Sequence, residues 1–208
     1  MIAMPSSRPS IVVFDIGGVL LDWDPRYLYR KIFDDPERME WFLSEVCTPA
    51  WNLEQDRGRP WAKAVAERIA LYPDHADAIR AFDERWVETV SQPIMSNVAL
   101  LEKLRGKGVP TYAITNFSAE KYDVAREVFP FLNGFDGMIV SGAEHLLKPD
   151  PAIYQLLLDR YHLKAADCLF IDDVVKNADA ARAIGMHAHH YVSSENLAQE
   201  LRQQGFPV

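Results

Sequence analysis

The acidic residues best placed for chemistry in this sequence follow short apolar runs. Asp15 comes directly after the run Ile11–Phe14, and Asp172 and Asp173 come at the end of another such run. Adjacent carboxylates repel one another, and a divalent cation readily offsets that cost. Asp15 could instead cap a turn and Asp173 a helix, but we favour a reactive carboxylate at Asp15 and a metal site at the pair.

Polar groups of other kinds follow two further segments. Thr115 and Asn116 end the run that begins at Thr111, and Lys148 precedes a helix-like stretch. Hydroxyl and amide groups at a strand end can bind phosphate oxygens, although bonds to the local backbone are commoner. A single lysine is usually solvated, yet its compact charge also suits a phosphate. These residues are therefore candidate anion ligands.

The elements that must position these groups alternate along the chain. Apolar runs typical of strands buried on both faces occur at 11–14, 111–114, 138–140, 168–171 and, more weakly, 188–191. Helix-like stretches occur at 98–107, 150–161 and 175–184. The alternation predicts an α/β fold, a three-layer Rossmann-like core in which helices cover both faces of a parallel sheet of about five strands.

One long segment interrupts this alternation. From Asp24 to Gln92 no strand-like run appears, and the sequence is helical in pattern, rich in tryptophan and punctuated by proline. We expect several short helices that form an all-helical cap over residues 25–92, inserted after the first strand. Residues 1–24 and 93–208 would then form the α/β hydrolase core.

Composition and charge limit the function further. The 208 residues are 49% hydrophobic and carry a formal net charge of −8, which disfavours nucleic acid and anionic membrane surfaces as partners. Met1–Ser10 has no apolar core of a secretory signal, and no apolar run is long enough to cross a bilayer. Cys47 and Cys168 suggest neither a disulfide framework nor a metal site. We expect a soluble, cytoplasmic monomer or weak homodimer.

Ligands of a parallel sheet bind at the carboxyl ends of its strands, so the candidate residues should converge there. Four segments resemble the ordered motifs of the haloacid dehalogenase superfamily, namely Phe14-Asp15-Ile16-Gly17-Gly18-Val19, Ile114-Thr115-Asn116, Lys148–Tyr154 and Phe170-Ile171-Asp172-Asp173. The resemblance spans nearly the whole chain, including a helical cap after the first motif. The cap placement and the glycine pair resemble the subgroup that includes sugar-1-phosphate phosphatases and the phosphatase domain of soluble epoxide hydrolases.

The resemblance implies a Mg²⁺-dependent phosphatase that acts on a small phosphorylated metabolite, with a sugar phosphate as one candidate. Asp15 would attack phosphorus and form an aspartyl-phosphate. Mg²⁺ would be held by Asp15, the backbone carbonyl of Gly17, and Asp172 or Asp173.

The resemblance also implies where the substrate is held. Thr115 and Lys148 would hold phosphate oxygens, while Asn116 orients Thr115 or faces the cap. The substrate contacts implied in this way are Gly17, Gly18, Thr115, Asn116 and Lys148, together with Trp51 and Arg57 from a cap loop that dips toward the nucleophile. For the two cap residues, simple helix-connection chemistry with Trp51 as cap core is at least an equal alternative.

Gly17 departs from the family pattern. Most phosphatases of the superfamily carry a second aspartate there, which protonates the leaving group and later activates water. General acid–base catalysis contributes about 10²–10⁴-fold, so its loss is serious for a poor leaving group. Three explanations are open: a better leaving group such as an anomeric sugar oxygen, another carboxylate from among Asp22, Asp24 and Asp56, or poor turnover.

Two other functions compete with the phosphatase. A 2-haloacid dehalogenase would form an aspartyl ester and also needs no acid at Gly17, but such enzymes lack the acidic pair at the fourth motif. Asp172 and Asp173 would leave unpaired charges beside Asp15 unless a cation compensates, which favours phosphate chemistry. The second alternative is a catalytically weak binding or regulatory protein on the same scaffold.

Overall fold

The computed structural model describes residues 8–208, so most of the N-terminal segment and the start of the predicted core, residues 1–7, lie outside the described residues. Five parallel strands form the central sheet in the order β5-β4-β1-β6-β7. These are β1 (Ile11–Phe14), β4 (Thr111–Thr115), β5 (Gly137–Val140), β6 (Cys168–Asp172) and β7 (His187–His190). The predicted α/β class and parallel sheet are confirmed.

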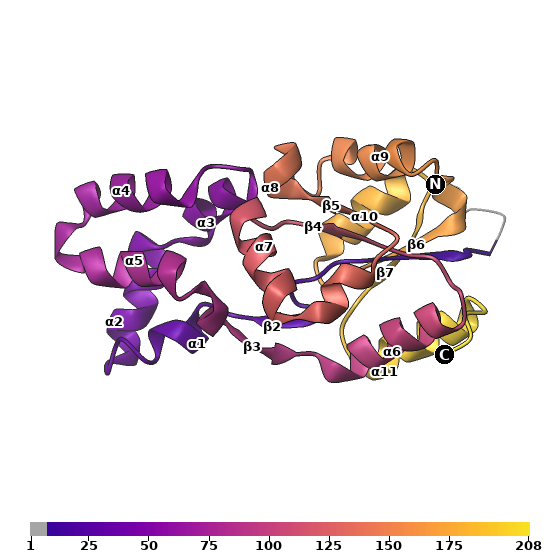
Figure 1. Ribbon diagram of the computed structural model, residues 1–208, viewed down its shortest axis with the longest axis horizontal. Coiled ribbons are helices and arrows are strands. Elements are labelled where there is room, and N and C mark those ends of the chain that lie inside the picture. Colours follow the sequence, from indigo (N-terminus) through magenta and orange to yellow (C-terminus); the bar gives the residue numbers. More distant parts are fainter. Residues whose placement is uncertain (1–7) are drawn as a thin grey trace.

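Helices cover both faces of this sheet (Figure 1). Because successive side chains of a strand point to opposite faces, Val12 and Phe14 pack in one buried cluster and Val13 packs in another. The helices concerned are α6 (Met95–Gly106) and α11 (Ser194–Gln203) on the first face, and α9 (Pro151–Arg160) and α10 (Val175–Ala183) on the second. Further helices of the core are α7 (Ala119–Val128) and α8 (Ser141–Glu144).

The ends of these helices follow local chemistry. Asp150 caps α9, because its carboxylate accepts a hydrogen bond from the backbone N–H of Ala152 at 2.9 Å, and proline occupies the first helical position. Helix α6 begins at Met95, three residues before the predicted start. The prediction missed this first turn because Met95 is exposed and does not belong to the buried apolar face of the helix. Among the residues that the structure describes, no helix is long and apolar enough to cross a membrane.

A helical lobe lies at one end of the core (Figure 1). Its α-helices are α1 (Arg26–Tyr29), α2 (Pro36–Trp41), α3 (Pro49–Asp56), α4 (Trp61–Leu71) and α5 (Ala76–Glu84), with a π-helical turn at Phe42–Val46 and a 3₁₀ turn at Trp86–Thr89. Aromatic rings fill its interior; those in mutual contact include Tyr29, Phe42, Trp51, Trp61 and Phe82. The same buried cluster continues into the core, where it includes Ile16, Phe117 and Leu132.

A two-stranded antiparallel ribbon connects the lobe to the core. It pairs β2 (Leu21–Trp23) with β3 (Val90–Pro93), so the prediction that no strand occurs between Asp24 and Gln92 is wrong at its end. Of the four β3 residues only Val90 is buried, so the segment lacks the alternation of apolar and polar residues that predicts a strand. It forms a strand because it pairs with β2. Strand β3 runs across the predicted boundary between residues 92 and 93, whereas β2 ends just before the other boundary. The division at residues 24 and 93 stays a prediction.

Candidate active site

A buried cluster of charges lies at the carboxyl edge of the sheet. Asp15 directly follows β1, Asp172 ends β6, and Lys148 lies between their carboxylates. The Lys148 ammonium nitrogen is 2.7 Å from Asp15 Oδ2 and 2.7 Å from Asp172 Oδ2, and its side chain is only 1% exposed. Two carboxylates thus share one buried cation, and the exposed Asp173 lies beside them.

The electrostatics of the cluster reflect this excess of negative charge. Burial raises the pKa of Asp15 to about 7, against the opposing charge of Lys148 and with a further upward contribution from Asp172. Burial alone would lower the pKa of Lys148, but the two carboxylates outweigh it and hold that pKa above its ordinary value. Burial and the charge of Asp172 also raise the pKa of Asp173. A divalent cation would offset this repulsion.

The donor atoms fit such a cation. Carboxylate oxygens of Asp15, Asp172 and Asp173 lie within 4.8 Å of one another, and they are the one such group of three or more potential ligands in residues 8–208. Asn177 fixes the middle carboxylate, since its Nδ2 donates to Asp172 Oδ1 at 3.0 Å and to Oδ2 at 3.1 Å. The backbone N–H of Val174 donates to the same Oδ1 at 2.8 Å. Oriented oxygen donors of this kind suit Mg²⁺.

The two glycines after Asp15 differ in their surroundings. Gly18 has φ +73°, and a Cβ there would lie 2.4 Å from Asp173 Oδ2, so only glycine permits this approach of the loop to the acidic pair. Gly17 lies outside the left-handed region, and no heavy atom lies within 4 Å of the Cβ position. Its backbone therefore does not require glycine, and the space beside it is open.

The second predicted motif positions the lysine. Asn116 Oδ1 accepts a hydrogen bond from the backbone N–H of Lys148 at 2.8 Å, and Asn116 Nδ2 donates to the Lys148 carbonyl at 3.1 Å. This reciprocal pair orients the backbone that carries Lys148, a role different from the two predicted for Asn116. Thr115, 1% exposed, ends the neighbouring strand β4 at the same edge.

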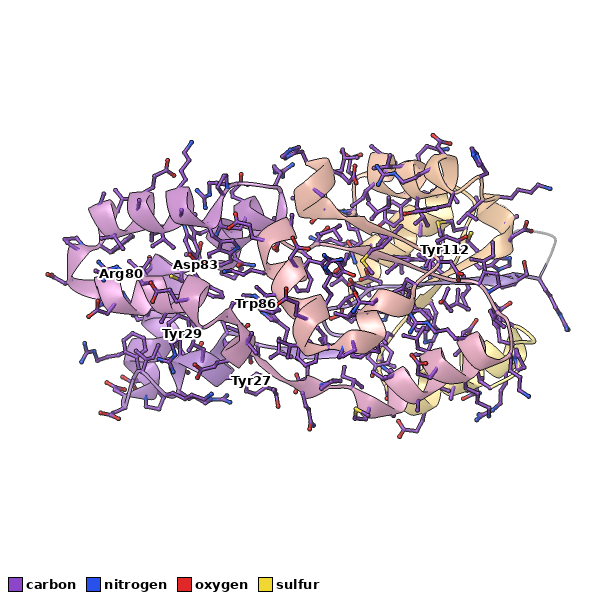
Figure 2. The ribbon with its side chains drawn as sticks, in the orientation of Figure 1. Tyr27, Tyr29, Arg80, Asp83, Trp86 and Tyr112 are labelled. Atoms are coloured by element: carbon purple, nitrogen blue, oxygen red, sulfur yellow. The ribbon has the colours of Figure 1, made fainter. Side chains whose placement is uncertain are left out.

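A pocket lies beside this cluster, between the core and the lobe. Gly17 and Asn116 line it from the core, and Asn52 and Asp56 line it from α3. Figure 2 shows Trp86 where the lobe meets the core. The apolar part of the lining consists of Leu21, Trp23, Trp61, Trp86, Val90 and Phe117.

Hydrogen bonds fasten the lobe to the core around this pocket. Trp61 of the lobe donates from Nε1 to Ser118 Oγ at 2.9 Å and from its backbone N–H to Glu120 Oε1 at 3.0 Å. Lys121 of α7 forms an ion pair with Asp83 of α5 and donates to its carbonyl at 2.9 Å. Ser118 and Lys121 line the pocket but were not predicted, because nothing in the pattern of their segment distinguishes them from ordinary helix residues.

A family model for haloacid dehalogenase-like hydrolases matches residues 9–185. The chain belongs to this family. It is 29% identical over 191 residues to the sesquiterpene phosphatase astK of Aspergillus oryzae, and the match covers 92% of this chain and 94% of that protein. Several other relatives are much longer, and this chain covers 11% to 38% of their length.

Solved structures of haloacid dehalogenase family enzymes share the fold. The magnesium complex of an enzyme from Bacteroides thetaiotaomicron has a TM-score of 0.76 at 18% identity and covers 94% of this chain and 100% of its own. The L-2-haloacid dehalogenase of Xanthobacter autotrophicus has a TM-score of 0.62 at 18% identity and covers 96% and 85%. The predicted family and its hydrolase class are therefore confirmed.

The structure does not bring the two predicted cap residues of this hydrolase to the pocket. Trp51 is 5% exposed in the lobe interior, where its ring lies edge-on to Trp61 at 5.7 Å, because the buried side of α3 faces the other lobe helices. Arg57 is exposed and pairs with Glu54 at 3.7 Å. Asn52 and Asp56, which lie between them in the sequence, line the pocket instead.

Proposed function

We propose that this hydrolase cleaves small phosphomonoesters through an aspartyl-phosphate formed on Asp15. The observation that carries the proposal is Lys148 held between Asp15 and Asp172, with Asp173 adjacent. The buried ammonium and the acidic carboxylates together match a phosphoryl group bound through a divalent cation. Phosphatases among the relatives, astK included, lend further support.

The residues that would hold Mg²⁺ are Asp15, Asp172 and Asp173, with the backbone carbonyl of Gly17. When bound, Mg²⁺ would neutralise charge on the phosphoryl oxygens and on the carboxylates. Lys148 and Thr115 hold the other phosphoryl oxygens, which keeps the phosphorus in line with the attacking oxygen of Asp15.

Two displacements at phosphorus complete the reaction. An Asp15 oxygen attacks phosphorus and the bond to the leaving oxygen breaks, which gives the aspartyl-phosphate and an alcohol. Water then attacks the same phosphorus, the bond to Asp15 breaks, and inorganic phosphate leaves. Asn116 contributes by fixing the backbone of Lys148, and Asn177 by fixing the Asp172 carboxylate.

The pocket beside the cluster would receive the leaving group. Six of its lining residues are apolar, and three of these are tryptophans: Trp23, Trp61 and Trp86. This lining favours a substrate whose alcohol carries an apolar portion over a fully hydroxylated sugar. A sugar phosphate remains the alternative substrate class.

The test is turnover of purified protein with Mg²⁺ against phosphates of apolar alcohols, sugars and nucleosides. We expect phosphate release that stops with a chelator and returns with Mg²⁺. The Asp15→Asn variant, nearly isosteric, should keep the fold and lose turnover. No release from any substrate at enzyme levels sufficient for several turnovers would favour a binding or regulatory protein. Chelator-insensitive release of halide from a 2-haloacid would instead identify a dehalogenase.

A further inference from the structure

Cleavage of an alkyl phosphate needs a proton on the departing oxygen, and Gly17 has none to give. This inference rests on the proposed phosphatase function. Gly17 lines the pocket and faces open space, so the position that usually holds the acid is empty of any other side chain in residues 8–208. The proton donor must therefore come from another element that reaches the same pocket.

Two of the three predicted substitutes lie elsewhere. Asp22 accepts a hydrogen bond from the hydroxyl of Tyr27 at 2.8 Å, and Asp24 accepts one from the backbone N–H of Arg26 at 2.9 Å. Both line a second hollow, which shares Trp23 and Asn52 with the pocket but does not include Gly17 or Asp56. Their side chains already serve the local structure around α1.

Asp56 is the one carboxylate among the described residues that lines the pocket together with Gly17. It is the last residue of α3, and its Oδ2 accepts a hydrogen bond from Asn52 Nδ2 at 3.2 Å. The backbone N–H of Ser118 also bonds to its carboxyl group, and its carbonyl accepts a bond from Ser141 Oγ. We propose that Asp56 is the acid–base residue of this hydrolase, supplied by the lobe in place of an aspartate at position 17.

The environment of Asp56 suits a proton donor at neutral pH. Burial raises its pKa to about 7, against the bond from Ser118. The charged groups of the neighbouring elements contact other partners. Lys121 pairs with Asp83, and Glu120 accepts from the backbone of Trp61. Arg57 pairs with Glu54, Arg59 contacts Gln55 and Glu67, and His145 contacts the Arg57 carbonyl. The Asp56 carboxyl group therefore keeps its proton to a higher pH than an exposed aspartate does.

The proton balance of the two displacements follows. As the bond between phosphorus and the leaving oxygen breaks, that oxygen takes the proton of Asp56 and departs as the alcohol. The Asp56 carboxylate then accepts a proton from the water that attacks the aspartyl-phosphate. Asp15 leaves as a carboxylate, inorganic phosphate forms, and Asp56 is protonated again.

Two substrates with leaving groups of different acidity separate this role from a structural one. We expect Asp56→Asn to lower the rate of the first step with a primary alkyl phosphate by about 10²–10⁴-fold. With p-nitrophenyl phosphate, whose leaving group needs no proton, rapid mixing should still release p-nitrophenol in a burst of one equivalent. Turnover after the burst should be slow, because the variant lacks the base for the water.

Asp22→Asn is the matched control, since the same change lies in the other hollow and should leave both substrates unaffected. Adding Gly17→Asp to Asp56→Asn should restore cleavage of the alkyl phosphate, because the space beside Gly17 is open. In the wild type, the rate of alkyl phosphate cleavage should fall above pH 7, and this fall should be absent in Asp56→Asn.

Three results would overturn the assignment of Asp56. One is an equal decrease in the rate of the first step with both substrates in Asp56→Asn. Another is an unchanged rate of the variant with the alkyl phosphate. The third needs no variant: a steep dependence of wild-type rates on leaving-group acidity would show that no acid acts. Failure of the proposed function looks different, because then the wild type releases no phosphate or Asp15→Asn retains activity.

Discussion

Replacing Gly18 by alanine tests how the loop after β1 shapes the acidic pair. The new Cβ would lie 2.4 Å from Asp173 Oδ2, and the residue would remain at φ +73°. The clash involves the end of an exposed side chain, so rotation of Asp173 toward solvent relieves it. That rotation carries one carboxylate away from Asp15 and Asp172.

The expected magnitude has two parts. A residue with a side chain in the left-handed region costs about 1–2 kcal/mol. For a chain of this size each kcal/mol lowers the melting temperature by about 2–4 °C, so the total decrease should be about 2–8 °C. Displacement of Asp173 should also weaken Mg²⁺ binding by about 10-fold or more.

Thermal unfolding in a chelator measures the first part, and calorimetric titration with Mg²⁺ measures the second. Gly17→Ala is the matched control, because its backbone is not left-handed and its Cβ meets no atom within 4 Å. It should leave the melting temperature within about 1 °C, as is usual for substitutions without a clash. If Gly18→Ala matched this control in both measurements, the close packing of Gly18 against Asp173 would be refuted.

Three further predictions concern the charges of the site. Lys148→Met leaves two buried carboxylates without their cation, so the free energy of unfolding in a chelator should fall by up to about 3–5 kcal/mol. Denaturant titrations should then show that Mg²⁺ adds more stability to the variant than to the wild type. Asn177→Ala removes both side-chain bonds to Asp172 and should weaken Mg²⁺ binding about 10–100-fold in a calorimetric titration. The raised pKa of Asp56 means that the folded protein binds more protons than the unfolded chain between pH 3.8 and about 7, so stability decreases as pH rises through that window. Denaturant titrations of Asp56→Asn should show a smaller decrease over the same window.

The sheet and the polar groups at its carboxyl edge could be predicted from the sequence because the signal for both is local. A strand buried on both faces is a continuous apolar run, and a polar residue at its end is visible in the same few positions. Asp15, Thr115 and Asp172 lie at strand ends as expected, and Lys148 joins them. The common direction of the strands then brings together residues that are far apart in the chain.

The lobe side of the site could not be predicted, because it depends on contacts between distant segments. Trp51 and Trp61 are both aromatic residues of lobe helices, yet one fills the interior and the other also faces the pocket. The pairing of Lys121 with Asp83 joins residues 38 positions apart, and neither position carries a motif. The ribbon strand at Val90 likewise exists only because β2 lies beside it.

An acid on the lobe has a consequence that an acid at position 17 would not have. The half-buried Asp56 carboxyl group lies where the lobe meets the core; the backbone N–H of Ser118 bonds to it, and Ser141 Oγ donates to the backbone carbonyl of the same residue. Separation of the lobe would expose the carboxyl group to water, and its pKa would return toward 3.8. It would then lose its proton at neutral pH. If Asp56 is the acid, proton donation would therefore require contact between the lobe and the core, which also excludes water from the leaving group.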